Sequence, residues 1–160
     1  MEAVRRWLTL LLLSCSSSGS PGVDGAVGSG APNGLSLTVE GTKAEFTDVT
    51  ATFTGAPFNR LRVSARRGAD PMLEELQVAA AGDTPLHAGA YSCADASETG
   101  LFYGVGDEAY DDGGDCIVTI TKAVTGAGQE AAGSFTGSVT DGTTKKMLSG
   151  TFRVTVMSSN

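Results

Sequence analysis

Apolar residues recur at every second position in several short segments of this chain. A strand turns successive side chains to opposite faces of a sheet, so this alternation is typical of strands with one buried face. The segments that show it are 35–39, 61–65, 76–80, 135–139 and 148–156. Turn signals separate them, among them Asp141-Gly142, a typical hairpin turn. The pattern therefore predicts strands over these segments.

In two places the pattern allows more than one structure. Phe46 has the opposite parity to Val49 and Phe53, so we expect a bulge or break near Thr47-Asp48. Asp70-Pro71 is typical of a helix start, with Asp as the cap and Pro at the first helical position. The alternation that follows it favours a strand instead, and we predict the strand.

The middle of the chain is rich in Gly and Asp but still contains strand-like runs. Residues 88–93 and 101–103 each predict a short strand, and residues 116–122 form the strongest strand candidate in the chain. All segments together give about eight or nine short strands at regular spacing, which favours an all-β fold, an antiparallel β-sandwich. A small β-barrel is the alternative architecture.

The N-terminus has a different pattern. Arg5 and Arg6 precede an apolar run that ends at Leu13, and the small residue Ser14 stands directly before Cys15. A positive region, an apolar region and a small residue at the cut are the parts of a secretory signal. The apolar run is far shorter than the roughly 20 residues that a membrane-spanning helix needs.

The four residues Leu12-Leu13-Ser14-Cys15, preceded by the two arginines, resemble the lipobox of bacterial lipoprotein signals. The resemblance implies that Cys15 carries a diacylglycerol thioether and becomes the new N-terminus, held to a membrane by its acyl chains. Ser16 after it resembles outer-membrane rather than inner-membrane sorting in Gram-negative envelopes. An ordinary cleaved signal, with Cys15 incidental, and a twin-arginine signal are the alternatives.

These signals divide the chain into three parts. Residues 1–14 are the expected signal peptide. Residues 15–33 combine the lipidated cysteine with a Ser-, Gly- and Pro-rich segment that behaves as a flexible tether. Residues 34–160 are the β-domain.

Charge and cysteine count narrow the function further. The chain carries a net charge of −7, and loss of residues 1–14 removes Arg5, Arg6 and Glu2, one net positive charge, leaving −8. Such an acidic protein repels phosphate backbones, so nucleic-acid binding is disfavoured. With Cys15 assigned to lipid, Cys93 and Cys116 remain, and in an exported chain such a pair predicts a disulfide.

An acidic segment, residues 107–115, is the most distinctive stretch of the mature chain. Its carboxylates are Asp107, Glu108, Asp111, Asp112 and Asp115. Clustered oxygen ligands on a flexible loop suit Ca²⁺, so we expect a loop that could bind calcium, although the spacing is not that of an EF-hand. A solvated acidic loop that only keeps the domain soluble is the alternative.

Catalytic groupings are scarce. His87 is the only histidine and falls in an expected turn, and no G-x-S-x-G motif is present for a serine nucleophile. A hydrolase, with paired carboxylates acting on a glycosidic bond, is therefore the least favoured class. The sequence favours a non-catalytic binding or structural module of the cell envelope, with a Ca²⁺-dependent carbohydrate or protein binder as the alternative.

A second resemblance covers roughly residues 88–156. The order GAYSC, a Gly/Asp-rich stretch, CIVTITK, GSFTGSV and SGTFRVTV is similar to functionally uncharacterised bacterial lipoproteins with a small disulfide-clipped β-sandwich. This resemblance implies a fold and a disulfide, and it implies no activity.

Overall fold

The computed structural model describes residues 33–159 except residues 96, 97 and 123. The expected signal peptide, the lipidated Cys15 and most of the tether therefore lie outside the described residues. The described part consists of strands and connecting turns without a helix, so it holds no helix that could span a membrane. The strands are β1 (Gly34–Val39), β2 (Thr42–Phe46), β3 (Asp48–Thr54), β4 (Arg60–Arg67), β5 (Glu74–Ala81), β6 (Gly89–Ser92), β7 (Gly100–Val105), β8 (Glu108–Asp112), β9 (Ile117–Ile120), β10 (Glu130–Thr140) and β11 (Lys145–Ser159).

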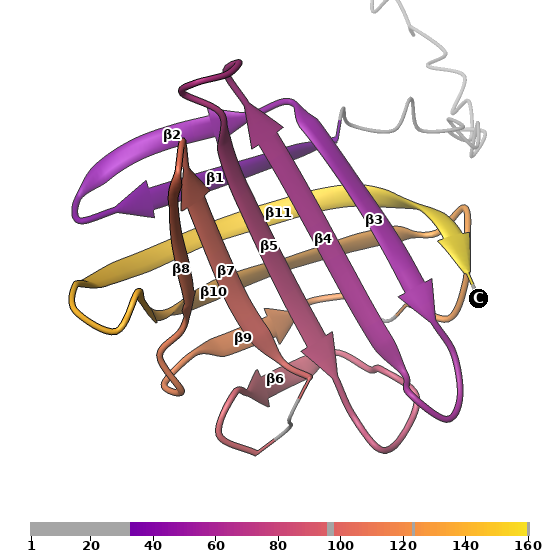
Figure 1. Cartoon of the computed structure of the whole chain (residues 1–160). Helices are drawn as coiled ribbons and strands as arrows, with labels where there is room; N and C mark the ends of the chain where they lie inside the picture. Colours follow the sequence, from indigo (N-terminus) through magenta and orange to yellow (C-terminus); the bar gives the residue numbers. More distant parts are fainter. Residues whose placement is uncertain (1–32, 96–97, 123, 160) are drawn as a thin grey trace, which may run out of the picture.

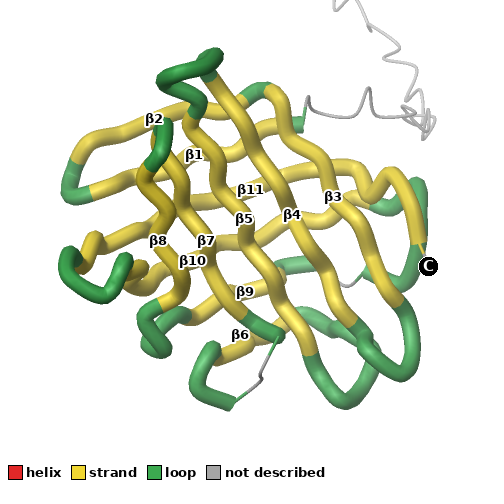
Figure 2. Tube along the Cα trace, in the orientation of Figure 1, coloured by secondary structure: helices red, strands yellow, loops and turns green. Residues whose placement is uncertain are grey.

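These eleven strands form one continuous sheet folded into two layers (Figure 1). One layer contains β3, β4, β5, β7 and β8, and the other contains β2, β1, β11, β10, β9 and β6. Hydrogen bonds join the layers where β11 pairs with β3 and where β8 pairs with β10. The strands of the front layer cross those behind it (Figure 2). The predicted all-β, sandwich-like fold is confirmed; the structure adds more strands than expected and one parallel pair, β11–β3.

The change of parity after Phe46 marks the passage between the layers. β2 ends at Phe46, β3 begins at Asp48, and the two strands lie in different layers. Phe46, Val49 and Phe53 are all buried. The break predicted near Thr47-Asp48 is thus confirmed, because it lets both strands point their apolar side chains into the same core.

The segment after Asp70-Pro71 is the strand β5, as predicted. It lies between β4 and β7 and hydrogen-bonds to both, while Leu76 and Val78 are buried in the core. A helix at this place would leave the facing backbone groups of β4 and β7 without strand partners, whereas the strand β5 pairs with both. The Asp141-Gly142 hairpin is confirmed too, since residues 141–144 connect the paired strands β10 and β11.

The acidic segment is where the structure corrects the sequence analysis. Residues 108–112 are not a loop but the strand β8, which pairs with β7 over residues 108–111 and with β10 at Asp111 and Asp112. Tyr110, only 3% exposed, is the buried anchor of this strand. One inward aromatic among acidic residues gives too weak an alternation to be recognised in the sequence. Conversely, the strongest strand candidate contains only the four-residue strand β9.

Candidate functional site

Three loops meet at one end of the domain, the lower end in Figure 1. They connect β3 to β4, β5 to β6, and β6 to β7, and they surround a cavity of about 470 Å³. The side chains that matter for its chemistry are Phe58, Asp83, Tyr91, Asp95 and Glu98. We call this end of the domain the cavity end. The volume of the cavity falls within the range of small-ligand sites.

Tyr91 fixes the loop between β5 and β6. Its hydroxyl donates a hydrogen bond to the carbonyl oxygen of His87 and accepts one from the His87 backbone N–H, both at 2.9 Å. Leu86, next to His87, is buried in the core and anchors the same loop. The imidazole of His87 is exposed beside the Tyr91 ring. His87 is thus a turn residue, as the sequence analysis expected.

The cavity has an acidic and aromatic lining. Asp83, Asp95 and Glu98 are all exposed at its walls, and Arg60 forms an ion pair with Glu98 at 2.6 Å. Phe58 is 57% exposed and gives this wall of the cavity an aromatic, apolar surface. Negative charge concentrated in a concave surface attracts cations. The lining therefore suits a ligand with a positive or hydroxyl-rich part and an apolar face.

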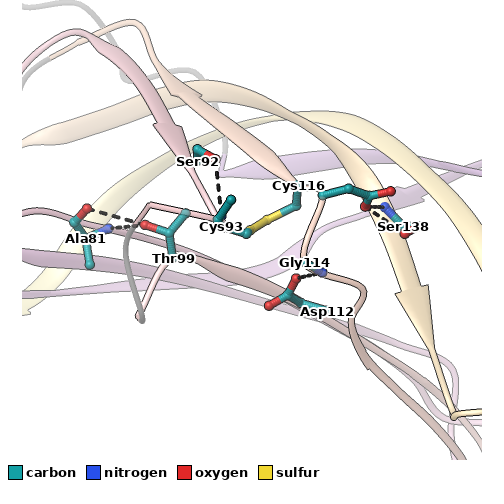
Figure 3. Close-up of a disulfide and its surroundings, with 10 residues drawn as sticks. Ala81, Ser92, Cys93, Thr99, Asp112, Gly114, Cys116 and Ser138 are labelled. Carbon is teal, nitrogen blue, oxygen red and sulfur yellow. Dashed lines mark hydrogen bonds between the residues drawn. A yellow bond between two sulfur atoms is a disulfide. The ribbon is translucent and has the colours of Figure 1, made fainter.

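Buried hydrogen bonds and a disulfide hold the segments that form the cavity wall. The hydroxyl of Thr99 is buried, accepts a hydrogen bond from the Ala81 N–H at 3.0 Å and donates one to the Ala81 carbonyl at 3.3 Å. The predicted disulfide between Cys93 and Cys116 is confirmed and joins the end of β6 to the start of β9 (Figure 3). It clips the chain directly after Ser92, which lines the cavity.

Gly137 on β10 allows Cys116 to lie unusually close to the β10 backbone. A Cβ atom at position 137 would lie 2.5 Å from the Cβ and 2.6 Å from the Cα of Cys116. The two chains therefore approach each other at a distance that only glycine allows. The position of Cys116 depends on this contact as well as on the disulfide.

Two of the five acidic residues of segment 107–115 have strong protein partners. Glu108 accepts a hydrogen bond from the Tyr110 hydroxyl at 2.7 Å and pairs with Lys146, and both partners, Tyr110 first, lower its pKa. Asp115 accepts hydrogen bonds from the Ser138 hydroxyl at 2.7 Å and the Ser138 N–H at 2.8 Å. These bonds, followed by Lys145, lower the pKa of Asp115 to about 2.

The other three acidic residues of the segment lie in three different surroundings. Asp107 lies in the turn before β8, Asp111 stands opposite Phe102 on β7, and Asp112 accepts a hydrogen bond from the Gly114 N–H at 2.5 Å. Within the described residues these carboxylates do not converge on a common point. The loop that the calcium prediction assumed is therefore wrong, because strand pairing spreads the acids. Calcium binding itself stays a prediction, which calorimetric titration with Ca²⁺ tests.

At the opposite end of the domain, which we call the closed end, polar and aromatic side chains contact one another. The Tyr103 hydroxyl donates a hydrogen bond to Glu74 at 2.9 Å, and Arg67 pairs with the same carboxylate. Burial, followed by the bond to Glu74, raises the pKa of Tyr103. The ammonium of Lys146 lies 3.9 Å from the centre of the Tyr110 ring, a cation–π contact. The contacts of Glu74 join neighbouring strands of one layer, whereas that of Lys146 with Tyr110 links β11 in one layer to β8 in the other. A second hollow of about 410 Å³ lies beside Arg67 and Glu74.

Sequence reasoning missed the cavity. Its lining comes from three loops, from the end of β5 and from β6, and none of these segments carries a recognisable motif. The one available signal was Phe58, a large apolar residue inside a Gly- and Pro-containing turn. A search of family models, curated proteins and solved structures found no match to this chain. Its function must therefore be argued from the residues themselves.

Proposed function

We propose that this protein is a lipoprotein of the bacterial cell envelope, lipid-anchored through Cys15, whose β-domain is a non-catalytic binding module that uses the cavity. The support for the anchor is the run from Arg5 to Cys15 with its lipobox-like end. The support for binding is the concave, aromatic and acidic surface between the three loops.

The observation that carries the proposal is the position at which the tether joins the β-domain, relative to the cavity. The side-chain amide N–H of Asn33 donates to the Val49 carbonyl, and its oxygen accepts from the Thr155 N–H. Val49 lies at the start of β3, and Phe58 lies beyond the other end of that strand. A seven-residue strand is roughly 20 Å long. A tether attached at residue 33 would thus join the domain at the end opposite the cavity.

The tether fits this arrangement. A Ser/Gly-rich segment of its length reaches roughly 25 Å as a random coil. Two acyl chains on one cysteine are enough for stable anchoring. This reach leaves the cavity accessible to partners within the envelope.

The anchor is tested by mass spectrometry of the mature protein and by fractionation of the Cys15→Ser variant. We expect an N-terminus at residue 15 that carries a diacylglycerol mass, in the membrane fraction and preferentially in the outer membrane. The variant should lack this mass and leave the membrane fraction. An acyl-free N-terminus in the wild-type protein would sink the proposal.

Binding is tested by capturing envelope glycans, peptides and proteins on the immobilised mature domain. Phe58→Ala removes the exposed aromatic at the cavity, and Met72→Ala removes a similarly exposed side chain far from it, at the turn before β5. A ligand that Phe58→Ala loses and Met72→Ala keeps supports the cavity as the binding site. Equal retention by both variants contradicts it.

A further inference from the structure

The sheet has two outer edges, and one of them borders the cavity. β2 and β6 are the first and last strands in the sheet order, so within the described residues each pairs with a single neighbour. β6 pairs with β9, and its residues Ala90, Tyr91 and Ser92 line the cavity. It lies at the lower end of the domain (Figure 1). A strand edge without a partner therefore forms part of the proposed binding site.

The alternation of backbone hydrogen bonds indicates which groups of β6 face outward. The Cys93 N–H donates to the Cys116 carbonyl at 2.9 Å, and from there every second residue of β6 bonds to β9. The backbone groups of Ala90 and Ser92 consequently point to the open side. The Ser92 carbonyl accepts the Asp95 N–H at 3.2 Å. The N–H and the carbonyl of Ala90, an exposed residue, have no such partner among the described residues.

The two edges differ in their protection against pairing with another chain. Proteins blunt an exposed edge with charged side chains, above all lysine, or with proline. β2 carries Lys43 and Glu45, which are 68% and 60% exposed and form an ion pair. β6 has the sequence GAYS, which contains neither a charge nor a proline. An edge of this kind can accept an added strand, the recognition mode called β-augmentation.

The charges around β6 favour a basic partner. Asp83 precedes β6 and Asp95 follows it; both are exposed at the cavity walls, and neither forms an ion pair within the described residues. Only Glu98 has a cationic partner there, Arg60. A second copy of this acidic chain would bring like charges together, which disfavours pairing between two β6 edges. Positive side chains on the added strand would instead meet uncompensated carboxylates.

We propose that the ligand of the cavity is an extended peptide segment with lysine or arginine side chains, which joins β6 as a further strand of the sheet. This inference rests on the proposed function, because it names the ligand class of the same site. The peptide backbone pairs with the outward groups of Ala90 and Ser92. Its basic side chains pair with Asp83 or Asp95, and an apolar side chain contacts Phe58. The four residues of β6 span roughly 13 Å, so a peptide of about six residues covers the edge.

The first experiment tests strand pairing through the peptide, so that the protein stays unaltered. A capped hexapeptide of alternating lysine and valine is titrated into the mature protein, and binding is followed by fluorescence anisotropy. In a strand the N–H groups of alternate residues point to opposite edges. Methylation of the lysine nitrogens of the backbone, or of the valine nitrogens, therefore blocks one edge of the peptide at a time. We expect one of these two peptides to bind at least about tenfold more weakly than the other. Equal affinities overturn the pairing.

The second experiment tests the charges with matched double variants. Asp83→Asn/Asp95→Asn should weaken binding of the unmethylated peptide at least about tenfold and reduce its dependence on salt. Asp48→Asn/Asp107→Asn removes the same charge from exposed positions at the opposite end of the domain and should bind like the wild type. Equal affinity in the two double variants overturns the assignment of the carboxylates.

Failure of this inference can be told apart from failure of the proposed function. If the lysine peptide does not bind, but an envelope glycan is captured and lost in Phe58→Ala, the cavity is a binding site and its ligand is not a basic strand. If the peptide binds and Phe58→Ala, Asp83→Asn/Asp95→Asn and the methylated peptides all bind equally well, the peptide lies elsewhere and both proposals for the cavity are wrong.

Discussion

The two ends of the β-domain use the same kinds of residues in opposite ways. At the closed end, Glu74 is bound by Tyr103 and Arg67, and Lys146 lies over the ring of Tyr110. At the cavity end, carboxylates and aromatic rings are present too, but they line an open space. Among the ion pairs of the described residues, that of Glu98 is the one that involves an acidic residue of the cavity.

This difference indicates how an open end is kept rigid. At the closed end, charged and aromatic side chains contact one another. At the cavity end most of them line the cavity, and a disulfide, the buried hydroxyl of Thr99 and the close approach at Gly137 hold the surrounding strands. Changes at the two ends should therefore differ in size and in what they disturb.

The largest effect is expected from removing the disulfide at the cavity end. Cys93 and Cys116 are 23 residues apart, and the chain-entropy model gives about 3 kcal/mol for a loop of that length. The Cys93→Ser/Cys116→Ser double variant should lose about this free energy of unfolding in urea denaturation at constant m-value. A loss well below 1 kcal/mol would show that the backbone contacts alone hold this end.

The next largest effect is expected from Gly137→Ala. The new Cβ would overlap backbone and side-chain atoms of Cys116, so one of the two strands must move, at a cost of about 2 kcal/mol or more. Gly126→Ala is the control, since no atom lies within 4 Å of the added carbon there. Thermal unfolding should separate the two variants, and equal melting temperatures would contradict the close approach.

At the closed end, Lys146→Met should have a smaller effect. It removes the cation–π contact with Tyr110 and the ion pair with Glu108 while keeping most of the side-chain volume. We expect a loss of about 1 kcal/mol in urea denaturation, with ligand capture at the cavity unchanged. Lys43→Met, at a side chain that is 68% exposed, should cost less. Loss of ligand capture in Lys146→Met would mean that the two ends are coupled.

The smallest effect is expected from protonating Asp115. Its folded pKa of about 2 lies below its unfolded value near 4, so its contribution is complete above about pH 4 and is lost as pH falls through 2. The side chain is 47% exposed, so solvent screening keeps this contribution below about 1 kcal/mol. Between pH 5 and 2, the free energy of unfolding of Asp115→Asn should fall less than that of the wild-type protein, because the variant has no carboxyl group to protonate at this position. An identical pH dependence in both proteins would contradict it.

The sequence predicted most of the fold because one buried face leaves a clear pattern. Leu35, Leu37, Leu61 and Val63 alternate with polar residues, and all four are buried. β8 could not be predicted, since its pairing with β7 and β10 depends on long-range contacts and only Tyr110 faces the core. The sequence predicted the disulfide but not the cavity, because the folded sheet alone brings the lining residues together.

The last strand of the chain is also the central one. β11 pairs with β1, with β10 and with β3, so it takes part in both layers and joins them. Strands that are far apart in the sequence therefore share one neighbour. Until β11 is in place, β1, β3 and β10 lack the strand that joins them.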